Sequence, residues 1–146
     1  MILGIDPGPT ESGWVILDGD RVDSCGVNAT PEVVDLCRGW IHTLAIEKIV
    51  SYGMAVGESV FETVFWTGRM VEASYTQDVH RIPRLDVKLH LCHDSRAKDA
   101  NIRQALIDKL GPPGTKANPG PTYNVKSHAW AALAVAVTAA ETRINA

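Results

Sequence analysis

Three short strand-like segments joined by tight turns open the chain, and they limit the folds available to it. Apolar residues fill positions 2–5 and dominate positions 13–17, and an Asp-Pro-Gly-Pro-Thr turn at 6–10 separates the two segments. An Asp-Gly-Asp turn at 18–20 then leads into a third segment at 21–27. The sequence therefore predicts an antiparallel three-stranded meander at the start of the chain.

The remaining sequence predicts helices alternating with further strands. Thr30 and Pro31 are a favourable N-cap and first residue for a helix over residues 31–42. The other expected elements are a strand at 44–50, a helix at 58–76, a strand at 87–91, a helix at 97–110 and a terminal helix at 127–143 for which Ser127 can act as the cap. A meander followed by crossovers predicts an α/β fold similar to the RNase H-like arrangement, with a mixed five-stranded sheet flanked by helices.

Length and composition favour one globular domain over residues 1–146. The chain is 45% hydrophobic and 21% charged, which suits a soluble core. It has no apolar run of about 18 residues and no basic leader, so we expect a cytoplasmic protein with no membrane partner. Its three cysteines form no Cys-x-x-Cys pair, so neither a disulfide framework nor a zinc knuckle is indicated.

Two carboxylates are the first candidates for a functional site. Asp6 ends the first strand, and ligands in open α/β sheets bind at the carboxyl ends of strands. Glu47 lies within the otherwise apolar strand at 44–50, where a carboxylate is costly unless it is paired or bound to metal. If these strands are adjacent and parallel, the two acids can share Mg²⁺ or Mn²⁺. The alternatives are that Asp6 only begins an Asp-Pro turn and that Glu47 marks a solvated edge strand.

Three segments resemble the motifs of RuvC-type Holliday junction resolvases, most closely the compact, phage-type members. Residues 2–14 match the opening motif, in which an apolar strand ends in Asp followed by Pro-Gly and by a Gly-aromatic pair on the next strand. Residues 46–47 resemble the second motif. Residues 128–138 resemble the last, in which two acidic or histidine ligands lie three residues apart on the terminal helix, ahead of an Ala-Leu-Ala run.

The resemblance implies a homodimeric endonuclease of DNA recombination and repair that cuts four-way DNA junctions. Each active site of this family uses two Mg²⁺ or Mn²⁺ ions, which activate a water and stabilise the leaving 3′ oxygen. By this resemblance Asp6 bridges the ions, Glu47 holds one of them, and His128 takes the first ligand position of the terminal helix.

Position 131 departs from the family pattern. Three residues beyond His128, where the family usually has Asp, the chain has Ala131, which cannot bind metal. Another acid can replace the missing ligand, activity can be reduced, or the alanine can be an inactivating substitution. Asp99, at the start of a predicted helix, is the candidate replacement, although a favourable interaction with the helix dipole explains it more simply.

Charge along the chain is uneven and suggests where DNA would bind. Residues 1–75 carry eleven acidic and four basic residues, whereas residues 76–146 carry six acidic and ten basic residues. A solvated face explains this equally well, but a basic half beside an acidic pocket also suits a nuclease that holds a phosphate backbone. We interpret Lys98 and Arg103, near one helix N-terminus, as phosphate contacts.

The middle of the chain is rich in large apolar side chains. Tyr52 and Met54 lie in the loop before the helix at 58–76 and are candidates to wedge between unstacked bases at the junction centre. The helix itself carries more large apolar residues than one face can bury, namely Phe61, Phe65, Trp66 and Met70. The surplus suggests a dimer interface, which would provide two symmetric active sites.

Three other functions compete with a resolvase. Actin-like ATPases also begin with a strand, an Asp and a phosphate-binding turn, but they need a far longer chain than 146 residues. A catalytically inactive dimer that only binds junctions would follow if Ala131 abolishes cleavage. An RNA-directed nuclease of the same fold would read the 2′-hydroxyl directly.

Overall fold

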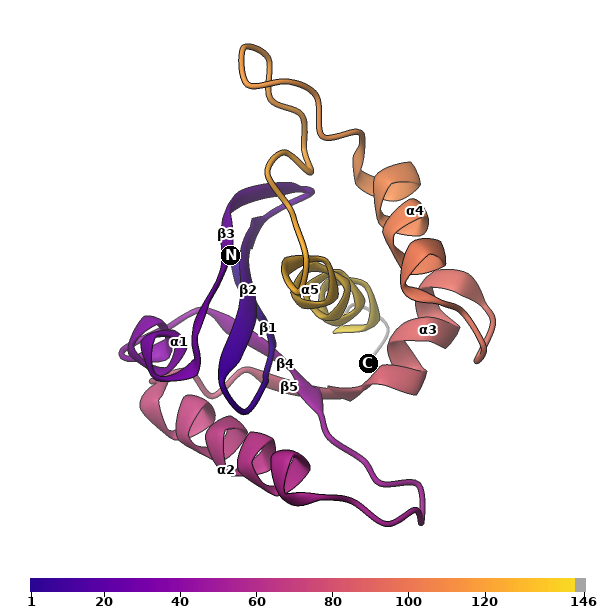
Figure 1. Cartoon of the computed structure of the whole chain (residues 1–146). Coiled ribbons are helices and arrows are strands. Elements are labelled where there is room, and N and C mark those ends of the chain that lie inside the picture. The colour runs from indigo at the N-terminus through magenta and orange to yellow at the C-terminus, as the bar shows by residue number, and fades with distance from the viewer. Residues whose placement is uncertain (144–146) are drawn as a thin grey trace.

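Five strands form one mixed sheet in the computed structural model, which describes residues 1–143. The strands are β1 (Ile2–Asp6), β2 (Glu11–Asp18), β3 (Arg21–Ala29), β4 (Thr43–Lys48) and β5 (Val79–Pro83). Their order across the sheet is β3-β2-β1-β4-β5 (Figure 1). The first three pair antiparallel, and β4 and β5 run parallel to β1. The predicted meander with parallel crossovers is confirmed.

Among residues 1–143, five helices cover the two faces of this sheet. They are α1 (Thr30–Cys37), α2 (Glu58–Ala73), α3 (Arg84–Cys92), α4 (Asp99–Leu110) and α5 (Ala129–Arg143). Figure 1 shows α1 and α2 on one side of the sheet and α3, α4 and α5 on the other. Alternate strand residues point to opposite faces, so β1 supplies Leu3 and Ile5 to the first layer and Ile2 to the second. No helix among the described residues is both long and apolar enough to span a membrane.

Two strand glycines let α5 lie directly against the sheet. A Cβ built on Gly4 would collide with the backbone oxygen of Ala132, and one on Gly13 would collide with the backbone of His128. The alanine-rich face of α5 therefore packs closely on β1 and β2, and this packing fixes where His128 enters the site.

The fifth strand lies outside the predicted range. Residues 87–91 belong to α3, and β5 is formed by residues 79–83 instead, so that prediction was wrong. Val87 and Leu91 are both buried, and their four-residue spacing fits one helix face as well as a strand's alternation. The Pro83 that ends β5 is tolerated because β5 is an edge strand.

Neither predicted N-cap is found. Thr30 is the first residue of α1, and its side chain donates a hydrogen bond to the Gly8 carbonyl oxygen and contacts the Ser12 hydroxyl, so it braces the turn after Asp6. This helix ends at Cys37, earlier than the predicted residue 42. At the other end of the chain, α5 begins at Ala129, which leaves Ser127 one residue ahead of the N-cap position.

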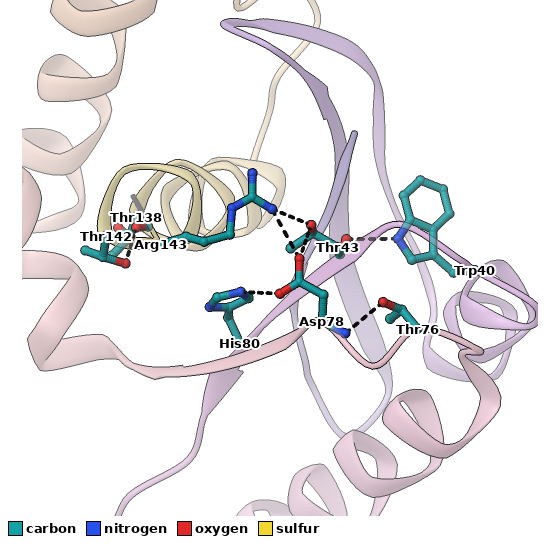
Figure 2. A network of polar contacts seen from close by, with 8 residues as sticks. All are labelled: Trp40, Thr43, Thr76, Asp78, His80, Thr138, Thr142 and Arg143. Atoms are coloured by element: carbon teal, nitrogen blue, oxygen red, sulfur yellow. Dashed lines mark hydrogen bonds and ion pairs between the residues drawn. The ribbon is translucent and has the colours of Figure 1, made fainter. Parts of the chain in front are cut away.

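A polar network closes the end of the parallel strands that is opposite the Asp6 end of β1. Asp78, just before β5, accepts hydrogen bonds from Thr43 and Arg143, and His80 lies 2.8 Å from its other oxygen (Figure 2). The Thr43 hydrogen bond is the main reason why the pKa of Asp78 is lowered. Because Thr43 begins β4 and Arg143 ends α5, the network fastens that helix to the sheet at this end.

Candidate active site

Asp6 and Glu47 lie side by side at the carboxyl ends of neighbouring strands. Asp6 is the last residue of β1, and Glu47 is next to last in β4. The strands pair in parallel with Ile5 opposite Ile46, so the following residues are brought together, as the sequence predicted for adjacent parallel strands. The Asp6 side chain is only 16% exposed. Two carboxylates are thus held close together in a half-buried position.

Burial changes the protonation of this pair. Burial, with the negative charge of Asp6 added to it, raises the pKa of Glu47 to about 7. Burial also raises the pKa of Asp6, although the neighbouring His128 and a hydrogen bond with Glu47 offset part of that rise. Near neutral pH the pair therefore shares a proton, which a bound cation would displace.

His128 approaches the pair from the start of α5. Its Nδ1 lies 3.1 Å from Oδ2 of Asp6, and its Nε2 lies 4.0 Å from a carboxylate oxygen of Glu11. The imidazole is 55% exposed, so it remains accessible to a ligand in the pocket. A nitrogen donor is thus added beside the carboxylate pair.

These side chains line one open pocket of about 500 Å³. The lining includes Asp6, Glu47, Arg84, Asp99, Arg103, Ser127, His128, Trp130 and Ala131. All four predicted catalytic residues therefore surround the same space, and so does one predicted DNA contact, Arg103. Ala131 presents only a methyl group to this space.

The donor set is short for a metal site. Mg²⁺ is commonly held by one or two carboxylates and completes its shell with water and substrate phosphate oxygens. Asp6 and Glu47 can act in this way, with His128 beside them. Among residues 1–143, however, no three His, Cys, Asp or Glu side chains form a ligand group by themselves. Ala131 adds no donor to this set, so a second ion in the described pocket would have to share ligands with the first.

Asp99 makes an ion pair with Arg84 and lines the same pocket as the carboxylate pair. Arg84 is the first residue of α3 and Asp99 the first of α4, and the two side chains meet across the gap between these helices. Their exposed fractions are 38% and 84%. The predicted role of Asp99 as a replacement ligand thus stays a prediction, and its partner in the structure is an arginine.

Arg84 was missed by the sequence reasoning. Its positive charge lowers the pKa of both Asp6 and Glu47, so it acts directly on the carboxylate pair. A basic residue directly after a strand that lies beside the Glu47 strand would have indicated a site residue. Because the strand was predicted at 87–91, residue 84 was not placed at the end of a strand.

Of the four predicted DNA contacts, only Arg103 lines the pocket. Arg103 lies on the pocket wall, with its guanidinium 5.6 Å from the centroid of the Trp130 ring. Lys98 is at the N-cap position of α4. Tyr52 and Met54 are not part of the pocket lining and lie in the loop between β4 and α2, 55% and 70% exposed. Their roles at a junction stay predictions.

Two solved structures of RuvC from Thermus thermophilus resemble this chain over almost its full length. The first is 21% identical, with a TM-score of 0.66, and the match covers 99% of this chain and 96% of that one. The second, RuvC in complex with a Holliday junction substrate, is 20% identical, with a TM-score of 0.69 and coverage of 99% and 95%. The chain has the fold of RuvC.

This similarity confirms the predicted RNase H-like α/β fold. Scans against protein-family models and curated protein sequences found no match. The RuvC likeness is therefore carried by the arrangement of the elements.

Proposed function

We propose that this protein is a structure-specific endodeoxyribonuclease that cleaves four-way DNA junctions by metal-assisted hydrolysis. The Asp6–Glu47 pair, with His128 beside it, carries this proposal because it presents metal-binding donors at the open edge of a RuvC-like sheet. One of the similar RuvC structures contains a Holliday junction substrate, which supports branched DNA as the ligand.

Each pocket residue has a distinct role in this proposal. Asp6 and Glu47 would hold a divalent cation, Mg²⁺ or Mn²⁺, and His128 would either complete the ligand set or hold Asp6 in place through their hydrogen bond. When bound there, such a cation would supply positive charge for activating a water and for stabilising the leaving oxygen. Lys98 and Arg103 bind phosphates on either side of the cut.

Cleavage of a labelled four-way junction tests the proposal, beside a linear duplex and an RNA–DNA hybrid, each with Mg²⁺ or Mn²⁺. Paired symmetric nicks in the junction are expected, with little cutting of the duplex. Asp6→Asn should lower the rate at least about a hundredfold, ~2.7 kcal/mol of activation free energy. Cutting of the hybrid alone would instead identify an RNA-directed nuclease.

We further propose that α2 forms a homodimer interface. Three of its apolar residues, Phe61, Val64 and Phe65, are 64%, 44% and 57% exposed. On the same helix the indole nitrogen of Trp66 is buried without a hydrogen-bond partner in the described chain. Exposed apolar clusters of this kind commonly mark protein contacts, and two symmetric subunits would nick two strands of a junction.

Phe65→Glu should convert the dimer into a monomer, because it places a charge within an apolar interface. Sedimentation equilibrium should give twice the 15.8 kDa chain mass for the natural protein and the single chain mass for the variant. Leu89→Glu, on α3 and 45% exposed, is the matched control and should stay dimeric. A natural protein that is monomeric at all concentrations would contradict the interface.

A further inference from the structure

The pocket has few metal ligands for a reaction that needs positive charge. Asp6 and Glu47 present two carboxylates to the pocket with His128 beside them, and Ala131 contributes no donor. Phosphodiester hydrolysis nevertheless develops negative charge on the phosphate and the leaving oxygen, and a fixed charge in the site must stabilise it. Where a second metal ion is missing, a positively charged side chain can supply the charge that this ion would add.

Arg84 lies where such a charge would act. It follows β5 directly, and β5 runs parallel to β4 with Pro83 opposite Lys48. The guanidinium therefore lies at the same edge of the sheet as Glu47, on the wall of the same pocket. Its positive charge lowers the pKa of both carboxylates, in keeping with this position.

The ion pair with Asp99 fixes the guanidinium and leaves part of it free. The described hydrogen bond uses Nη2 of Arg84, whereas a guanidinium has five N–H donors in a planar fork. The side chain is 38% exposed, so solvent or a ligand can reach it. This fork matches two oxygens of a phosphate, and an arginine already held in place loses less entropy on binding.

We propose that Arg84 binds the scissile phosphate in place of a second metal ion, and that Asp99 is the positioning residue that holds its guanidinium. The site then takes a single divalent cation. This inference rests on the proposed nuclease function, and it differs from the two-ion site that the RuvC resemblance implies.

Counting bound metal tests the first half of this proposal without DNA. Mn²⁺ titration of the natural protein, followed by electron paramagnetic resonance, should give one ion per chain. Asp99→Asn should bind Mn²⁺ with unchanged affinity, because Asp99 contacts Arg84 and not the metal. Two ions per chain, or an affinity weakened tenfold in Asp99→Asn, would overturn the proposal.

Phosphate binding and cleavage test the second half. Arg84→Gln should weaken the binding of a deoxynucleoside 3′,5′-bisphosphate at least about tenfold in calorimetry with Mn²⁺, and should slow junction cleavage about a hundredfold. Arg84→Lys should restore part of both effects, and Asp99→Asn should slow cleavage less than Arg84→Gln does. Arg81→Gln, an exposed arginine outside the pocket, is the control and should change neither.

The two hypotheses fail in different ways. A natural protein that cuts no junction, duplex or hybrid contradicts the proposed function, while the bisphosphate measurement still decides the role of Arg84. Unchanged bisphosphate binding in Arg84→Gln overturns the arginine proposal even if the natural protein cuts junctions.

Discussion

Ala131→Asp is expected to speed junction cleavage at least about tenfold, ~1.4 kcal/mol of activation free energy, and to create a second divalent-cation site. Residue 131 lies in the first turn of α5, three residues beyond His128 at the N-cap position, and both line the pocket that contains Asp6 and Glu47. An aspartate there would add a third carboxylate and make a second ligand set possible. The Mn²⁺ count should rise from one to two per chain.

Ala131→Asn separates charge from shape in this experiment. Asparagine has nearly the size of aspartate but no negative charge, so it should leave the Mn²⁺ count at one and the cleavage rate little changed. If the natural protein binds junctions without cutting them and only Ala131→Asp cuts, the natural chain is a junction-binding dimer that has lost catalysis. An unchanged Mn²⁺ count in Ala131→Asp would mean that this position does not face the metal.

The carboxylate pair could be predicted because its cause is local. A single acid inside an apolar strand is costly unless it is paired, and Asp6 becomes its partner if the first and fourth strands are adjacent and parallel. Neither step depends on how the helices pack. The observed pairing of β1 with β4 follows from the same pattern.

Arg84 and the partner of Asp99 could not be predicted in the same way. The segment from Val87 to Leu91 alternates like a strand and also repeats every four residues like a helix, and only its packing against α4 and α5 decides between the two. With that segment taken as a strand, nothing brings residue 84 close to residue 99. The ion pair arises from the packing of α3 against α4, which no short pattern encodes.

Thr30 shows the same limit on a smaller scale. Its residue type and position suit an N-cap. Its hydroxyl instead donates a hydrogen bond to the carbonyl oxygen of Gly8, in the turn after Asp6. The competing partner lies 22 residues away in the chain. The N-cap preference of threonine thus predicted a polar residue at the helix start, but it did not predict the hydrogen-bond partner of its side chain.

Glu47→Gln is expected to stabilise the metal-free protein at pH 8 by about 2 kcal/mol and to have little effect near pH 4.5. The pKa of Glu47 is about 7 in the folded protein against an ordinary value of 4.5, so the folded state holds its proton more tightly than the unfolded state does. The stability that this proton confers is fully present below pH 4.5 and is lost as pH rises through 7. The full shift corresponds to ~3 kcal/mol, reduced here because Asp6 shares the proton.

Urea unfolding at pH 4.5 and pH 8, with EDTA and then with Mn²⁺, measures this effect. Mn²⁺ at a hundred times its Kd should stabilise the natural protein at pH 8 by about 2.7 kcal/mol, and should stabilise Glu47→Gln much less. Glu62→Gln, exposed on α2, is the control and should behave like the natural protein. A Glu47→Gln protein less stable than the natural one at pH 8 without metal would contradict the argument. That result would mean that contacts in the folded protein favour the charged form of Glu47. The expected result instead means that the charged Glu47 side chain destabilises the metal-free fold, and that a bound cation offsets this loss of stability.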